Sequence, residues 1–426
     1  MIRLDTRKKD FAKKFAKLVN RFSESDPKVT QAVAAIVEDV RKEGDAALFR
    51  WTHKLDNILL SPKTARIGKD EIKKAGKKLP DDLKEALVAA FVNIVEFHTH
   101  QAEQSWVLKD RTKRVGQIIL PLQRVGLYVP GGKASYPSSV LMNAAPAIVA
   151  GVEEIIICSP APGGEISPAV LFAADLCGIT EFYRVGGAQA VAAMAYGTKT
   201  IKKVDKIVGP GNAYVAEAKR TVFGAVGIDM IAGPSEICIV ADDSANPAWC
   251  AADVLSQAEH DEMALPIFIS PSEKMCNAVV EEAVRQAALL ERKAIAQKCL
   301  KSRFYVIKTR SINEAIGLAN EIAAEHLQLS FKGANKALGK IRNAGAVFVG
   351  NYSPEVLGDY MAGPNHVLPT SGSARFSSPL GVYDFVKRTS LIEYSRAAFR
   401  SVGRQVAVMA ESEGLTAHAL AAKIRL

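Results

Sequence analysis

A glutamine and a histidine stand three residues apart in the run SQAEH at 256–260. On a helix such positions share one face, so the amide oxygen of Gln257 and the imidazole of His260 could hold a cation together. Two ligands are too few for a catalytic zinc ion, which usually takes about three from the protein. Taken alone, the pair favours a polar helix end with ordinary hydrogen bonds, and a metal site would need distant residues to complete it.

A carboxylate stands beside an imidazole at Glu325 and His326. Such a pair offers one base for water and another for a hydroxyl group. We expect a helix over 312–326 to end here. Adjacent helical positions diverge by about 100°, so the two side chains would flank a substrate from two sides. A histidine stabilised by the dipole of a helix C-terminus explains these residues equally well.

Two more groups of polar residues follow toward the C-terminus. The loop 358–369 holds His366 and also Asp359, an oxygen donor that would suit a cation together with the pair described first. Glu413 and His418 are expected on the last helix, about 140° apart around its axis. More commonly, such a pair on a terminal helix is simply exposed to solvent.

Four glycine-rich turns lie within residues 128–235, at the expected carboxyl ends of strands, where parallel αβ sheets bind ligands. Small residues let backbone N–H groups approach a phosphate, and a following helix N-terminus favours negative charge. None of the turns is a Gly-x-Gly-x-x-Gly fingerprint or a P-loop. Their number nevertheless favours a cofactor that contains a pyrophosphate. The turns are VPGG at 129–132, VGGAQ at 185–189, VGPGN at 208–212 and AGPS at 232–235.

Strands and helices that would position these groups alternate from about residue 115 onward. The expected strands are 117–120, 124–129, 154–158, 181–185, 206–208, 236–241, 266–270, 304–308 and 346–349. The expected helices are 138–150, 168–176, 189–195, 213–223, 247–260, 273–290 and 312–326. This alternation predicts parallel sheets with helices on their faces. The flanking regions are expected to be helical at 1–21, 28–55, 82–106 and from about 406 onward.

Composition places the chain among ordinary globular proteins. It has 426 residues, of which 48% are hydrophobic and 23% charged, enough for a large core and more than one domain. Apolar runs are broken well short of roughly 18 residues, so no membrane span is expected. The six cysteines show no close pairing and the first 20 residues lack the long apolar core of a secretory signal. We therefore expect a reducing, cytoplasmic location.

The net charge of +10 is concentrated near the N-terminus. Residues 1–80 carry 20 of the 55 lysines and arginines but only 11 of the 45 aspartates and glutamates. A basic segment could attract nucleic acid. Interleaved acidic residues and few aromatic residues instead favour a solvated face, so we expect neither a nucleic-acid nor a membrane partner.

Six motifs, in this order, resemble the histidinol dehydrogenase family from about residue 115 to the C-terminus. The motifs are GLYVPGG at 126–132, VGPGN at 208–212, AGPSE at 232–236, SQAEH at 256–260, AEH at 324–326 and GPNHVLP at 363–369. Residues 1–80 match only in their general helical character.

The resemblance implies a zinc- and NAD-dependent oxidation of L-histidinol, via L-histidinaldehyde, to L-histidine, the last steps of histidine biosynthesis. It implies one Zn²⁺ per subunit, with ligands at Gln257, His260, Asp359 and His418. It implies an acid/base pair at Glu325 and His326, and NAD contacts at Tyr128, Gln189 and Asn212. It implies substrate contacts at Ser235, Gln257, His260, His326, Asp359, His366, Glu413 and His418.

The resemblance also implies a homodimer whose C-terminal regions cross over, so that Glu413 and His418 complete the partner's site. The expected fold is α/β, with two Rossmann-like αβα domains that lack the usual dinucleotide fingerprint and with helical N- and C-terminal extensions. The expected domains are a helical arm 1–23, a main domain 24–127 plus 236–379 carrying the metal and catalytic residues, an NAD-binding domain 128–235, and a helical dimer-exchange region 380–426.

Two alternative functions are kept at this stage. One is an NAD-dependent dehydrogenase of the same fold that oxidises another small polyol, such as a sulfonated diol. The other is a nucleic-acid-binding protein that uses the basic N-terminal 80 residues. The second alternative leaves the glycine turns and the histidine, aspartate and glutamate groups without a role.

Overall fold

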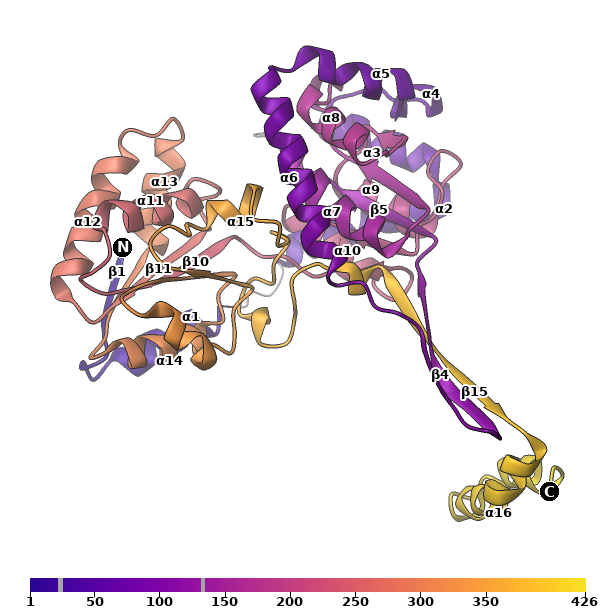
Figure 1. The fold of residues 1–426 in the computed structure, drawn as a ribbon. Helices are drawn as coiled ribbons and strands as arrows, with labels where there is room; N and C mark the ends of the chain where they lie inside the picture. Colours follow the sequence, from indigo (N-terminus) through magenta and orange to yellow (C-terminus); the bar gives the residue numbers. More distant parts are fainter. Residues whose placement is uncertain (22–25, 132–134) are drawn as a thin grey trace.

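The computed structural model describes residues 1–21, 26–131 and 135–426, and it shows two αβα lobes with a long arm (Figure 1). The predicted α/β class with two parallel, Rossmann-like layers is confirmed. Gly132 and the predicted boundary between residues 23 and 24 lie outside the described residues. Among the described residues, the structure contains no helix that is both long and apolar enough to cross a membrane.

Lobe A is built on a six-stranded, fully parallel sheet in the order β1-β12-β11-β10-β13-β14. Helices α11, α12 and α13 cover one face of this sheet, and α1 and α14 cover the other. The strands are β1 Ile2–Asp5, β10 Glu236–Ala241, β11 Leu265–Ser270, β12 Tyr305–Lys308, β13 His326–Ser330 and β14 Ala346–Val349. The helices are α1 Phe11–Val19, α11 Pro247–Ala258, α12 Glu273–Ala287, α13 Lys293–Arg303 and α14 Ile312–Ile322, followed by the short α15 Val356–Tyr360.

Lobe B carries a second sheet in the order β2-β7-β6-β5-β8-β9, parallel except for the antiparallel edge strand β2. Its strands are β2 Arg66–Ile67, β5 Arg124–Tyr128, β6 Glu154–Cys158, β7 Glu181–Tyr183, β8 Lys206–Val208 and β9 Gly227–Ile228. One face is covered by α5 Lys69–Lys74, α6 Asp81–Thr99, α7 Pro137–Ala150 and α8 Pro168–Leu176. The other is covered by α2 Pro27–Glu43, α3 Asp45–Asp56, α9 Gly187–Tyr196 and α10 Ala213–Val222.

The arm is an antiparallel ribbon that leads away from both lobes to two C-terminal helices (Figure 1). Its strands are β3 Trp106–Lys109, β4 Lys113–Pro121 and β15 Val386–Tyr394, and its helices are α16 Arg396–Ser412 and α17 Thr416–Lys423. The predicted helix 82–106 therefore ends earlier than expected, and the region after residue 380 contains a nine-residue strand that the sequence analysis did not predict. Residues 386–394 form a strand because they pair along their whole length with β4, a segment distant in sequence that supplies their backbone hydrogen-bond partners.

The N-terminus is not wholly helical, as was predicted for residues 1–21. Residues Ile2–Asp5 form an edge strand paired with β12, and the helix begins only at Phe11. Phe15 and Leu18 on this helix are buried against the sheet. Edge pairing outweighs helix propensity here because it satisfies the backbone groups of a segment whose apolar residues Ile2 and Leu4 alternate. The predicted arm 1–23 is therefore part of lobe A over its described residues.

Residues 24–127 were grouped with the main domain, but their described helices pack on lobe B. Helices α2 and α3 share a core with α9 and α10, and α6 shares a core with α7. Buried residues such as Val33 and Leu48 supply this apolar contact. The grouping of these helices with the main domain was therefore wrong. A single sequence shows that a helix has an apolar face, but not which of the two sheets that face packs against.

The strand order of lobe B has a topological switch point between β5 and β8. The chain winds from β5 through β6 to β7 on one side and then returns to β8 on the other, so the order reverses between these two strands. Ligands of open αβ sheets bind outside the carboxyl ends at such a point. Gly209 follows β8 here with φ +111, and its amide donates to Asp229 Oδ2 at 2.8 Å. A Cβ atom at Gly209 would overlap the carbonyl oxygen of Tyr128.

Replacing Gly209 with alanine should destabilise the protein, because the added methyl group meets a fixed backbone carbonyl. Gly224→Ala is the matched control, since Gly224 also has a positive φ of +99 but nothing within 4 Å of its would-be Cβ. We expect Gly209→Ala to cost about 1–3 kcal/mol more than the control in urea unfolding. Equal unfolding midpoints for the two variants would show that the close approach is not a constraint.

Candidate active site

His326 begins strand β13 and does not end a helix as predicted. Helix α14 stops at Ile322 because Ala323 adopts a left-handed conformation with φ +49. The chain then turns into β13, where His326 pairs with Ile237 of β10. The explanation by a helix dipole is therefore wrong. Glu325 and His326 lie at the amino edge of the lobe A sheet, whereas ligand sites of such sheets usually lie at the carboxyl edge.

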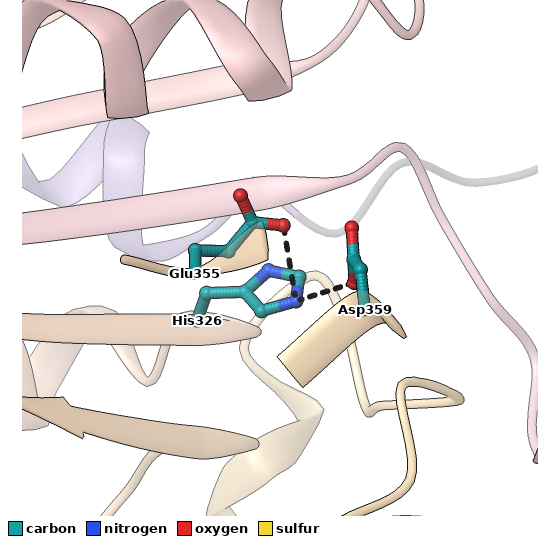
Figure 2. A group of neighbouring side chains, drawn as sticks. All are labelled: His326, Glu355 and Asp359. Carbon is teal, nitrogen blue, oxygen red and sulfur yellow. Dashed lines mark ion pairs between the residues drawn. The ribbon is translucent and has the colours of Figure 1, made fainter. Parts of the chain in front are cut away.

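The hydrogen bonds of His326 fix which ring nitrogen carries the proton. Its Nδ1 lies 2.9 Å from the carbonyl oxygen of Glu236, and because a carbonyl only accepts, Nδ1 must donate. In the neutral ring, Nε2 is then unprotonated and carries a free lone pair. This atom lies 3.9 Å from Glu355 Oε1 and 4.0 Å from Asp359 Oδ1, between the two carboxyl groups (Figure 2). Burial lowers the pKa of His326, although the nearby Glu355 charge opposes the shift.

Glu325 is buried beside His326 and is held by the same strand. Its Oε2 accepts a hydrogen bond of 2.8 Å from the backbone N–H of Glu236 and lies 3.6 Å from His326 Nδ1. Burial raises the pKa of Glu325 well above its ordinary value, and the bond from Glu236 only partly offsets this. A carboxylate in such a place is a stronger base than one in water.

Glu355 and Asp359 bring two carboxyl groups to one buried point. Glu355 directly precedes α15 and is fully buried, and its Oε2 accepts from Ser256 Oγ at 2.8 Å. Its Oε1 has no hydrogen-bond partner among the described residues. Burial and the neighbouring Glu355 raise the pKa of Asp359 well above its ordinary value. The sequence analysis missed Glu355, although its spacing of four residues from Asp359 is the signal of a shared helix face.

Several of these atoms fit a divalent cation. Ligand atoms of His326, Glu355 and Asp359 all lie within 4.8 Å of one another. Gln257, near the end of α11, is 1% exposed, and its Oε1 has no partner among the described residues. His260 stands two residues beyond this helix, close enough that its charge contributes to lowering the pKa of His326. Nitrogen and oxygen acceptors without donors are the ligand set that zinc accepts.

The loop that carries His366 joins the two lobes at the site. Asn93 of lobe B donates to the carbonyl of Met361 at 2.8 Å, and Asn365 donates to the carbonyl of Met142 at 2.6 Å. His366 Nδ1 lies 3.1 Å from the carbonyl of Asp359, to which it donates. Burial lowers the pKa of His366 to about 4, so the ring is neutral at physiological pH.

The three expected cofactor residues lie at the carboxyl edge of lobe B. The hydroxyl of Tyr128, at the end of β5, accepts from the backbone of Gly187 at 3.0 Å. Gln189 is fully buried, and neither of its amide atoms has a partner among the described residues. Asn212 caps α10 through its side-chain oxygen. A buried amide without partners is costly unless a ligand satisfies it.

Three predicted substrate or metal contacts remain. Ser235 lies near Glu325 and His326, whereas Glu413 and His418 do not. Ser235 directly precedes β10, beside Glu236, whose backbone contacts both Glu325 and His326. Glu413 and His418 do not share a helix as expected, because Gly414 with φ +72 separates α16 from α17. Both are exposed at the end of the arm, far from α15 in the same chain (Figure 1).

Comparisons with known proteins give one consistent result over the whole chain. The family model described as histidinol dehydrogenase matches residues 19–426. A histidinol dehydrogenase of Caldanaerobacter subterraneus subsp. tengcongensis is 52% identical over 96% of both chains, and one of Geobacter sulfurreducens is 49% identical over 99% of both. A crystal structure of histidinol dehydrogenase from Elizabethkingia anophelis is 36% identical with a TM-score of 0.93, covering 100% of this chain and 98% of that one.

Proposed function

This chain belongs to the histidinol dehydrogenase family, NAD-dependent oxidoreductases of histidine biosynthesis, and we propose that it oxidises L-histidinol in two steps at the site around His326. The single observation that carries the proposal is the pairing of Glu325 with His326 at the edge of a buried group of metal-type ligands. Both oxidation steps need a base, and this pair supplies two different ones.

We infer that Gln257, His260 and Asp359 hold a zinc ion together with His418 of a second copy of the chain. The unpartnered oxygen of Gln257 supports this choice, because a buried amide oxygen without a donor is costly unless it has a ligand. His326 and Glu355 also face the same point, but His326 is needed as a base. Bound zinc would supply a Lewis-acid template for the imidazole and amine of the substrate.

The hydrogen bonds of His326 support a role as the base in alcohol oxidation. Nδ1–H donates to the carbonyl of Glu236, so the free lone pair on Nε2 can take the proton of the substrate hydroxyl. The lowered pKa keeps the ring neutral and ready to accept it. In aldehyde oxidation Glu325 removes a proton from the attacking water, and His326 acts as base again. NAD, when bound, accepts a hydride in each step.

The nucleotide would lie at the switch point between β5 and β8. Gln189 offers a buried amide whose donor and acceptor both lack partners among the described residues. Asn212 uses its oxygen to accept from the backbone N–H groups of Tyr214 and Val215, which leaves its amide hydrogens to donate to a ligand. The hydroxyl of Tyr128 lies at the start of α9, where the helix N-terminus favours a phosphate.

The arm supports a homodimer with exchanged C-terminal regions. Ile392, Val408, Met409, Leu420 and Ile424 are large apolar residues of the arm that are all more than half exposed. Apolar groups gathered on one projecting element mark an interaction surface. A second copy that received this element would cover it and would gain Glu413 and His418 for its own site.

Replacing Glu325 with glutamine should separate the two steps. We expect aldehyde oxidation to fall roughly 10²–10⁴-fold, the usual contribution of a general base, while alcohol oxidation changes much less. His326→Asn should slow both steps by a similar factor. The measurement is single-turnover NADH formation from L-histidinol and, separately, from L-histidinaldehyde. In the native protein two NADH should form for each histidine.

The pH dependence provides the second readout of the same experiment. Because burial raises the pKa of Glu325, aldehyde oxidation should lose rate as the pH falls through an inflection well above 4.5. The inflection should be absent in Glu325→Gln. Equal damage to both steps by the two variants, or an inflection unchanged by the substitution, would refute these roles.

Subunit mixing should test whether His418 serves the partner's site. His326→Asn and His418→Asn homodimers should each be almost inactive. A heterodimer of the two carries one site with an intact His326 and an intact His418, so about half of the native activity should return. The heterodimer is isolated with two different affinity tags.

Mixing two subunits that both carry His326→Asn is the control, since no arrangement restores His326. A heterodimer of the two variants that remains inactive would show that the chain does not complete its partner's site.

A further inference from the structure

Arg21 is an arginine of the basic N-terminal segment whose side chain is buried. It follows α1 and its side chain is only 7% exposed. Its Nε and Nη2 donate to the two carboxylate oxygens of Glu236, both at 2.6 Å, in a bidentate pair. Such a fork fixes orientation as well as charge. The sequence analysis treated this segment as a solvated face, and Arg21 is an exception to that interpretation.

The partner of Arg21 holds both members of the acid/base pair through its backbone. The N–H of Glu236 donates to Glu325 Oε2 at 2.8 Å, and its carbonyl accepts from His326 Nδ1 at 2.9 Å. Its carboxylate also accepts from the backbone N–H of Ser371 at 3.1 Å. Any shift of Glu236 would therefore move the base that activates water and loosen the bond that sets the imidazole tautomer.

Arg21 also holds the turn that leads into the pair. Its Nη1 donates to the carbonyl of Ile322 at 2.9 Å and to that of Leu18 at 3.3 Å. Ile322 is the last residue of α14, directly before Ala323, whose left-handed backbone is unusual for a residue other than glycine. One guanidinium group thus joins α1, α14 and β10. Its contact on α14, Ile322, lies three residues before Glu325.

We propose that Arg21 is a positioning residue for the acid/base pair, acting through the Glu236 carboxylate and the carbonyl of Ile322. The inference rests on the proposed roles of Glu325 and His326. The hydrogen bonds of the Arg21 side chain to described residues all go to lobe A, so its loss should leave the binding of NAD in lobe B unchanged. It should lower the rate of the chemical steps, because small displacements of catalytic groups are costly.

The test compares Arg21→Met with Arg124→Met. Arg124 is a matched control, because it is also a buried arginine paired with carboxylates, Glu154 and Glu181, but it lies at the start of β5 in lobe B. Both variants should lose thermal stability. At a temperature well below both unfolding transitions, Arg21→Met should lower kcat roughly tenfold to a hundredfold with an unchanged KM for NAD. Arg124→Met should keep the native kcat.

Glu236→Gln is the second variant, used where Arg21→Met does not fold. It keeps the volume and the backbone of residue 236 but weakens the bidentate hydrogen bonding to Arg21. It should therefore lower kcat, as Arg21→Met does. A native kcat in the folded Arg21 variant, or in Glu236→Gln, would overturn the proposal and leave Arg21 with a structural role alone.

A double-mutant cycle with Glu325→Gln separates this inference from the proposed function. In aldehyde oxidation, the double variant with Arg21→Met should be impaired less than the product of the two single effects, since part of the Arg21 effect passes through Glu325. Multiplicative effects would overturn the inference while leaving Glu325 its role. Native aldehyde oxidation in Glu325→Gln alone would overturn that role and, with it, the inference.

Discussion

Hydrogen-bond acceptors converge on one buried point, and this constraint governs the site. His326 must donate from Nδ1 to a carbonyl, so its Nε2 lone pair faces the carboxyl groups of Glu355 and Asp359. Gln257 directly follows Ser256, which donates to Glu355, and its own buried amide oxygen has no partner among the described residues. Acceptors buried together repel each other unless protons or a cation lie between them. The proposed divalent cation, held by other residues than His326, would resolve this conflict.

The site combines residues from the amino edge of the lobe A sheet with residues from the carboxyl edge of the lobe B sheet. Glu325 and His326 lie at the amino edge of lobe A, because α14 ends in a left-handed turn directly before them. The proposed nucleotide site lies at the carboxyl edge of lobe B, where the strand order reverses. The loop around His366 contacts helices α6 and α7 of lobe B through Asn93 and Asn365, and so joins the two edges. The arm carries Glu413 and His418 away from both (Figure 1).

Local patterns in the sequence predicted the regular parts of this structure well. Strands β6, β8, β10 and β14 have the predicted bounds, because each is an apolar run between clear turn signals. Strands β1, β13 and β15 were missed because their backbone partners lie far away in sequence. Glu355 was missed for a related reason, since only the packing of α15 against Ser256 shows that it is buried. The proposed role of Arg21 rests on the same kind of distant contact.

Anomalous diffraction at the zinc absorption edge, from crystals of the zinc-loaded protein, tests the central claim most directly. The account predicts one strong peak per site, within bonding distance of the side chains of Gln257, His260 and Asp359, with an imidazole from the second copy's arm as a further ligand. A peak held instead by His326 and Glu355, or the absence of any peak at this cluster, would contradict it.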